Sequence, residues 1–218
     1  MRTVFDEKLK DMNNSLIEMG SLIETAIAGS FKALKTGDKE LAKKIMQDDK
    51  DVDRMEKTIE SKALDIMLRE QPVAVDLRKV TCALKIVTDM ERIGDNAADI
   101  AEISVSSDLA GIFDKISGID KMTVKTLAMV NDAVTAFVER KTDLAKEVME
   151  RDDEIDSLFD TIKRKLVEMV KSDESVTDIV VDTLMIIKYL ERISDHAVNI
   201  CEWVEFLKTG EYKNTRIL

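Results

Sequence analysis

A chain of 218 residues is long enough for one or two domains that each bury a hydrophobic core. With one proline, seven glycines and 4% aromatic residues, it lacks the frequent turn residues of an all-β chain, so aliphatic side chains and twelve methionines must fill a helical core. The formal net charge of −11 argues against binding to nucleic acid or to anionic lipid, because both need a basic face.

The first segment has apolar side chains mostly every three or four residues, which predicts an amphipathic helix of about nine turns. The members of this apolar stripe are Phe5, Leu9, Met12, Leu16, Met19, Ile23, Ile27, Phe31 and Leu34. The tripeptide Thr36-Gly37-Asp38 then predicts a turn, in which Gly37 ends this helix and Asp38 caps the next one.

A second helix and a third helix follow in the first half of the chain. The second apolar stripe consists of Leu41, Ile45, Val52, Met55, Ile59 and Ile66. Pro72, the only proline, interrupts the pattern before a third helix that we expect to end near Val105. Residues 106–118 are less periodic and contain Gly111 and Gly118, so we predict a connector there. The helical pattern then restarts, with helices expected near 119–140, 141–171 and 175–208.

The two halves of the chain repeat one another. The segment LAKKIMQDD from Leu41 matches LAKEVMERD from Leu144 at five of nine positions, with an offset of 103 residues. Later, ERIGDNAADIAE from Glu91 matches ERISDHAVNICE from Glu191 at seven of twelve positions, with an offset of 100. Helical periodicity explains matching apolar positions, but it does not explain repeated charged residues, so we infer a duplication.

The repeat predicts the fold class and the domain organisation. Short connections between successive helices make neighbouring helices antiparallel. We therefore predict an all-α protein with six helices, arranged as a tandem repeat of two antiparallel three-helix bundles. The first bundle is expected at 1–105, the connector at 106–118 and the second bundle at 119–218.

Four pairs of carboxylates stand four residues apart, which places both members on one helix face with Cβ atoms about 5–6 Å apart. They are Asp49 and Asp53, Glu91 and Asp95, Asp152 and Asp156, and Glu191 and Asp195. Other pairs with this spacing, such as Glu7 and Asp11, fit solvent-exposed helix faces. These four pairs differ because both halves of the chain carry them on the same helices.

Antiparallel packing of the second and third helices of each half would bring two such pairs together. Four close carboxylates repel one another unless cations neutralise them. Oxygen ligands suit hard ions, so the candidates are Mg²⁺, Mn²⁺, Ca²⁺ or iron in a multinuclear cluster, and zinc stays open as well. Asp99, Asn199 and the only histidine, His196, are further candidate ligands. We expect Arg92 and Arg192 to brace the carboxylates beside them.

The repeated blocks ERIGDNAADIAE and ERISDHAVNICE, together with the upstream acidic pairs, strongly resemble the duplicated signatures of the PhoU family over essentially the whole chain. The resemblance implies surface metal clusters and a cytoplasmic adaptor, commonly a homodimer, that negatively regulates phosphate uptake and the phosphate regulon. The partners that it implies are the phosphate-transporter ATPase and a phosphate-sensing histidine kinase. Ser194 replaces the motif glycine and Asn199 replaces the acid found at Asp99, so we expect the two sites to bind different numbers or kinds of ions.

Two other functions stay open at this point. One is an accessory protein of a low-affinity phosphate carrier, which would share the fold. The other is a ferritin-like di-metal enzyme, but its Glu-x-x-His motif is missing because Ile193 stands three residues before His196. The sequence also lacks a glycine-rich phosphate loop and a nucleophile–base arrangement, so we do not expect an enzyme.

Three further features bear on the location of the protein. The segment MRTVFDEKLK contains no apolar signal core, and no apolar run approaches the roughly 18 residues that a membrane-spanning helix requires. Cys82 and Cys201 lack the spacing of a metal site, which favours reduced thiols in the core. We therefore expect a cytoplasmic protein that does not insert into the membrane.

Overall fold

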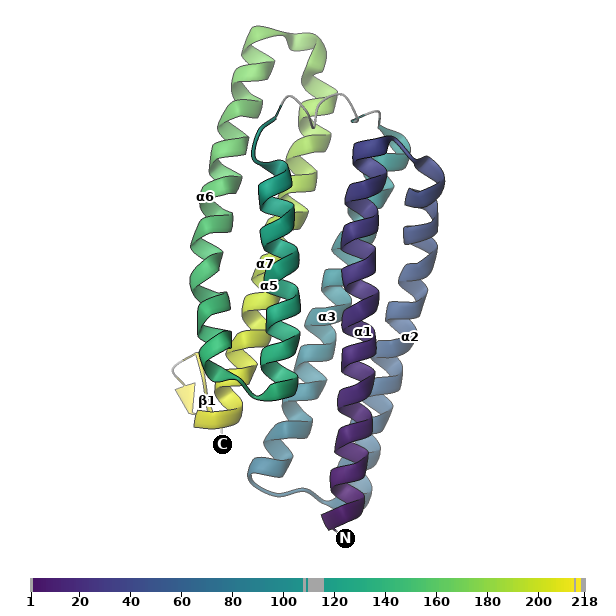
Figure 1. The fold of residues 1–218 in the computed structure, drawn as a ribbon, viewed down its shortest axis with the longest axis vertical. Coiled ribbons are helices and arrows are strands. Elements are labelled where there is room, and N and C mark those ends of the chain that lie inside the picture. The colour runs from purple at the N-terminus through teal and green to yellow at the C-terminus, as the bar shows by residue number, and fades with distance from the viewer. Residues whose placement is uncertain (1, 108, 110–115, 214, 217–218) are drawn as a thin grey trace.

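The computed structural model describes residues 2–107, 109, 116–213 and 215–216. Six long α-helices account for most of this described chain (Figure 1). The first half contains α1 (Arg2–Thr36), α2 (Lys39–Glu70) and α3 (Val75–Ser106). The second half contains α5 (Ile119–Glu139), α6 (Thr142–Ser172) and α7 (Thr177–Thr209), with a 3₁₀ turn at Glu174–Val176 before α7. The predicted all-α fold with three helices in each half is confirmed.

The turn between α1 and α2 follows the predicted capping. Gly37 has a φ of +68°, in the left-handed region that glycine adopts without strain, and the side chain of Asp38 accepts a hydrogen bond from the backbone N–H of Leu41 at 3.0 Å. The equivalent turn in the second half is different. Arg140 occupies the left-handed region with a φ of +57°, and Lys141 makes no side-chain capping bond. This second turn is therefore built without the two local signals of the first.

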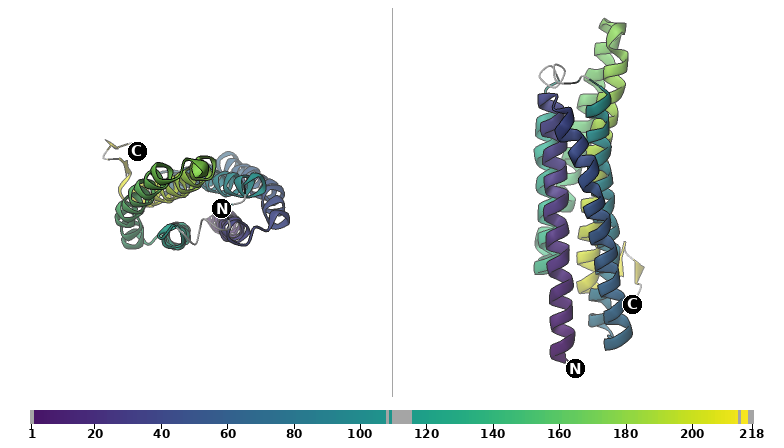
Figure 2. Two further views of the ribbon diagram at one scale, coloured as in Figure 1. Left: turned by 90° about the horizontal axis from the view of Figure 1, so that it is seen from above. Right: turned by 90° about the vertical axis from the view of Figure 1, so that its right-hand side faces the viewer.

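The two halves run in opposite directions along the molecule. α1 and α3 run upwards in Figure 1 and α2 runs downwards, whereas α5 and α7 run downwards and α6 runs upwards. The halves meet through contacts of α3 with α7 and of α1 with α5. Seen from above, α2, α3, α7 and α6 form a curved row, and α1 and α5 lie together on one side of that row (Figure 2).

One hydrophobic core joins the two bundles. The same cluster contains Met19 and Ile23 of α1, Ile93 of α3, Met129 of α5 and Ile193 of α7, all fully buried. The apolar stripe predicted for the first helix is almost entirely buried, because it faces this core. The two halves are therefore packed as one body. None of the described helices is both long enough and apolar enough to cross a membrane.

Two further segments outside the six helices are the connector between the halves and the segment after α7. The predicted connector at 106–118 lies partly outside the described residues, which lack 108 and 110–115. After α7, β1 (Glu211–Tyr212) pairs with β2 (Thr215–Arg216) in a short antiparallel hairpin. The Tyr212 ring stacks on Trp203 of α7 with ring centroids 4.0 Å apart, so this hairpin folds back onto the last helix.

Candidate metal centres

The fold brings the predicted carboxylate pairs of the first half together between α2 and α3. One carboxylate oxygen from each of Asp49, Asp53 and Asp95 lies within 4.8 Å of the other two. This group is the one set of three such carboxylates found among the residues that the structure describes. Glu91 lies beside it, since the charge of Asp95 helps to raise the pKa of Glu91. We refer to Asp49, Asp53, Glu91 and Asp95 as the first carboxylate cluster.

Gly94 allows α2 and α3 to approach closely at this cluster. A Cβ atom at this position would lie 2.9 Å from Cγ1 of Val52 and 3.3 Å from Oδ1 of Asp49. Real Cβ contacts are essentially never as short as the first of these distances. The glycine of the motif therefore keeps Asp49 near the carboxylates of α3.

Asp49, Glu91 and Asp95 of the first cluster have raised pKa values and therefore resist ionisation. Burial raises the pKa of Asp49 to about 6, and the charges of Asp95, Asp53 and Asp99 add to this effect. Burial is also the largest cause of the raised pKa of Glu91 and of Asp95. A nearby cation would remove this penalty, because it favours the charged form of each group.

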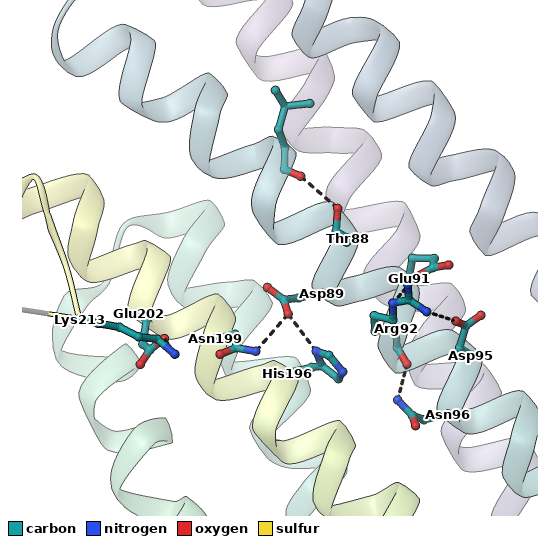
Figure 3. Close-up of polar contacts among 11 residues, drawn as sticks. Thr88, Asp89, Glu91, Arg92, Asp95, Asn96, His196, Asn199, Glu202 and Lys213 are labelled. Atoms are coloured by element: carbon teal, nitrogen blue, oxygen red, sulfur yellow. Dashed lines mark hydrogen bonds and ion pairs between the residues drawn. The ribbon is translucent and has the colours of Figure 1, made fainter. Parts of the chain in front are cut away.

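Arg92 supplies part of that positive charge from outside the cluster. Its guanidinium lies 3.2 Å from Oδ2 of Asp95 and 3.5 Å from Oε2 of Glu91, so it braces both carboxylates as expected (Figure 3). Arg192, its counterpart in the second half, acts elsewhere. Burial raises the pKa of Asp99 of the first half, and the positive charge of Arg192 partly opposes this rise.

Glu56 is a member of this carboxylate group that the sequence did not single out. It follows Asp53 by three residues on α2, and its pKa is raised by burial first and then by Glu60 and Asp53. Its charge also raises the pKa of Glu91 across the α2–α3 contact. A search restricted to repeated residues misses Glu56, because Phe159 stands at the equivalent position of the second half. The spacing of three from Asp53 is the signal that could have found it.

The second carboxylate cluster consists of Asp152 and Asp156 on α6 and Glu191 and Asp195 on α7. Burial raises the pKa of Asp152 to about 6, with further contributions from Asp195 and Asp156. Oδ1 of Asp152 is buried and accepts no hydrogen bond from the described residues. The nearby hydroxyl of Ser194, which donates to the backbone carbonyl of Glu191 at 2.7 Å, partly opposes the rise in the pKa of Asp152. The pKa of Asp195 is raised by burial and then by Glu191.

His196 and Asn199, the further candidate ligands of the second cluster, both contact Asp89 of α3 through a side-chain nitrogen. Nδ1 of His196 lies 2.9 Å from Oδ1 of Asp89 on α3, and Nδ2 of Asn199 donates to the same oxygen at 3.2 Å (Figure 3). Both side chains therefore serve the contact between α3 and α7. Asp99, the third additional candidate, lies beside the first cluster, where it raises the pKa of Asp49 and forms a hydrogen bond with Tyr189.

Asp95 and Asp195 take equivalent directions on α3 and α7. If Gly20 of α1 carried a Cβ atom, that atom would lie 3.9 Å from Cε of Met90, so this part of α3 faces α1. Asp95 follows Met90 by five residues, which places it about 140° further around the helix. The repeat puts Asp195 in the same position relative to Leu190 on α7. Since α1 and α5 lie on one side of the row of helices (Figure 2), we infer that Asp95 and Asp195 point away from that side.

The carboxylate oxygens of both clusters are the kind of donor that hard metal ions prefer, and the first cluster also has a spacing that fits one ion. Two oxygens that bind one Ca²⁺ or Mg²⁺ from opposite sides are about 4–5 Å apart, given metal–oxygen distances of about 2.0–2.6 Å. The spacing of Asp49, Asp53 and Asp95 satisfies this limit. In the second cluster, Oδ1 of Asp152 is buried without a hydrogen-bond partner among the described residues, and a bound cation would offset the cost of burying it.

Comparisons with known proteins agree with this architecture. The PhoU domain matches the chain twice, over residues 16–104 and 119–204. The phosphate-specific transport system accessory protein PhoU homolog of Clostridium acetobutylicum is 37% identical over 211 residues, which cover 96% of each chain. The accessory protein PhoU of Escherichia coli is 27% identical, over 95% of this chain and 86% of its own. The crystal structure of PhoU from Pseudomonas aeruginosa superposes with a TM-score of 0.88 at 32% identity and covers 95% of this chain and 100% of that chain.

Proposed function

Because the chain belongs to the PhoU family, we propose that it is a cytoplasmic adaptor that negatively regulates phosphate uptake and the phosphate regulon. Its relatives are named as accessory proteins of the phosphate-specific transport system, and these names support an accessory role in phosphate transport. The names do not mention the regulatory role or its two partners, the phosphate-transporter ATPase and a phosphate-sensing histidine kinase, which we add as part of the proposal. A homodimer is part of the same proposal, and light scattering would test it.

The observation that supports an adaptor best is the accessible negative charge of the two carboxylate clusters. Their eight carboxylates are half-buried or exposed. A face with such a concentration of charge steers partners and sets which surfaces can dock on it. Its charge would also change with the metal ions that it holds.

We propose that each cluster holds hard metal ions, with iron, Mg²⁺, Mn²⁺, Ca²⁺ and zinc as candidates. Asp49, Asp53, Glu91 and Asp95 would serve the first site, and Asp152, Asp156, Glu191 and Asp195 would serve the second. A bound ion supplies positive charge that lets these carboxylates ionise together. The protein residues contribute the oxygens, the close approach of α2 and α3 at Gly94, and the bracing of Glu91 and Asp95 by Arg92.

The position of His196 weighs against the ferritin-like enzyme. Redox di-metal sites in helical bundles take a histidine from a Glu-x-x-His motif on each of two helices. The single histidine of this chain binds Asp89 through Nδ1 instead of turning that nitrogen to the second cluster. The other alternative, an accessory protein of a low-affinity phosphate carrier, shares the fold and differs only in its partner. Proteins that co-purify from cells would separate these two adaptors.

A phosphate-responsive reporter in a deletion strain tests the regulatory role. Without the protein, phosphate-uptake genes should be expressed even when phosphate is plentiful, and the wild-type gene should restore repression. Normal repression in the deletion strain would contradict the regulatory assignment.

The same strain also tests the metal sites. The variant Asp95→Asn/Asp195→Asn keeps the size of both side chains and removes one charge from each cluster. It should fold and still repress poorly, because an incomplete cluster changes the charge of the docking face. Full repression by a variant that elemental analysis shows to be metal-free would leave the adaptor role intact but deny the metal sites any part in regulation.

A further inference from the structure

The two carboxylate clusters occupy equivalent places in the repeat, but several side chains beside them differ. Four of these differences lie on the faces that carry the cluster carboxylates, and three of them remove a negative charge or add a positive one in the second half. These pairs are Glu56 and Phe159, Thr88 and Lys188, Gly94 and Ser194, and Asp99 and Asn199.

Lys188 places a positive charge directly on the second cluster. Its ammonium group forms an ion pair and a hydrogen bond with Oε2 of Glu191. The same Nζ lies 5.7 Å from the centroid of the Phe159 ring, a distance at which a ring face attracts a cation. One neighbour of Lys188 is therefore a cluster carboxylate, and the other is the residue that replaces Glu56.

The first cluster has no such lysine and carries more negative charge. Thr88, at the position of Lys188, is exposed and donates its hydroxyl only to the backbone carbonyl of Leu84. Glu56 and Asp99 add two carboxylates beside the four of the cluster, and they raise the pKa of Glu91 and Asp49 respectively. Among the described residues, Arg92 is the cation that forms ion pairs with this cluster, and it pairs with Glu91 and Asp95.

We propose that Lys188 is the built-in cation of the second cluster, so that a divalent metal ion must displace it from Glu191 and binds there more weakly than at the first cluster. This inference rests on the metal-binding role proposed above. The first cluster then stays loaded at metal concentrations at which the second gains or loses its ion. The second cluster is accordingly the one whose charge responds to the metal supply.

The expected size of this effect follows from Coulomb's law. A unit charge about 6 Å from a divalent ion, at the dielectric constant of water, weakens binding about tenfold. Lys188 and Thr88 both lie on the surface, so exchanging the residue types at the two positions should leave the fold intact. Melting curves recorded without metal would verify this.

Titration of Mn²⁺ into metal-stripped protein tests the proposal, with free Mn²⁺ followed by electron paramagnetic resonance. Asp95→Asn disables the first cluster and so isolates the second, and Asp195→Asn does the reverse. In the first background, Lys188→Thr should tighten Mn²⁺ binding about tenfold, and in the second, Thr88→Lys should weaken it about tenfold. Lys163→Thr is the matched control, because Nζ of Lys163 also lies 5.7 Å from the Phe159 ring centroid but forms no ion pair with the described cluster residues. It should change the affinity less than twofold.

Two results would overturn the proposal, one by removing the role of Lys188 and the other by removing metal binding itself. Equal affinities of the two clusters, together with no effect of Lys188→Thr beyond that of Lys163→Thr, would show that Lys188 does not compete with metal. Absence of Mn²⁺ binding to the wild-type protein would instead overturn the metal-binding role itself and this inference with it. The reporter assay of the adaptor role would be unaffected by either result.

Discussion

The carboxylate of Asp89 on α3 accepts a hydrogen bond from Asn199 on α7, with 3.2 Å between Oδ1 and Nδ2. The repeat gives this contact a counterpart. Tyr189 stands at the position equivalent to Asp89, Asp99 stands at the position equivalent to Asn199, and these two side chains also share a hydrogen bond. The halves of the molecule thus meet around an approximate two-fold axis with one polar pair on each side of it.

The Asp89 contact should contribute more to stability than its counterpart, because this carboxylate contacts two side chains. Asp89→Ala leaves both His196 and Asn199 without their acceptor and should lower the free energy of unfolding by about 1–3 kcal/mol. Tyr189→Phe removes a single hydroxyl and should lower it by about 0.5–1.5 kcal/mol. Urea denaturation measures both values. A larger loss for Tyr189→Phe than for Asp89→Ala would contradict the interpretation.

Metal binding should stabilise the native protein. Ions that bind only the folded state raise the free energy of unfolding by about 2.7 kcal/mol at a hundred times the dissociation constant. The melting temperature should therefore rise with metal concentration, and the rise should be much smaller in Asp95→Asn/Asp195→Asn. Glu7→Gln/Asp11→Asn, which removes two charges from α1, is the matched control and should keep the full rise. An unchanged rise in the cluster variant would show that the ligands lie elsewhere.

The metal-free protein should lose stability as the pH rises. Burial raises the pKa of Asp49 and of Asp152 to about 6, above the ordinary value of 3.8. Between these values the folded state binds more protons than the unfolded state, so stability falls as the pH passes from about 4 to about 7. The melting temperature should be higher at pH 5 than at pH 7.5. Asp49→Asn/Asp152→Asn should flatten this difference, and an equally steep decline in that variant would rule out these two groups as its source.

Gly94 should tolerate a methyl group poorly. The Cβ atom of Gly94→Ala would lie 2.9 Å from Val52, and the strain of separating α2 from α3 should reduce stability by about 1–3 kcal/mol. The separation should also weaken metal binding at the first cluster. Gly20→Ala is the control, because it is also in a helix but its Cβ would meet Val134 at 3.3 Å, a contact that a small shift relieves. Equal effects of the two changes would show that the approach at Gly94 is not required.

Much of the architecture could be predicted because its signals are local. The apolar stripes, the capping Asp38 and the break at Pro72 each act within a few residues of the chain, and the helices of the structure begin and end close to the predicted positions. The carboxylate pairs are local as well, since a spacing of four residues places both groups on one helix face regardless of what packs nearby.

The partners of individual side chains could not be predicted in the same way. His196 follows Asp195 directly, yet it contacts Asp89. Successive residues of a helix point in directions about 100° apart, so His196 faces a different neighbouring helix. Glu56 acts on Glu91 only through the antiparallel contact of α2 with α3, and Lys188 meets Phe159 only through the contact of α6 with α7. The sequence by itself determined six helices, their repeat and the carboxylate pairs, because these depend on short-range periodicity and capping. Which charges those carboxylates face was decided by the tertiary structure, because that depends on which helices pack together and in which direction.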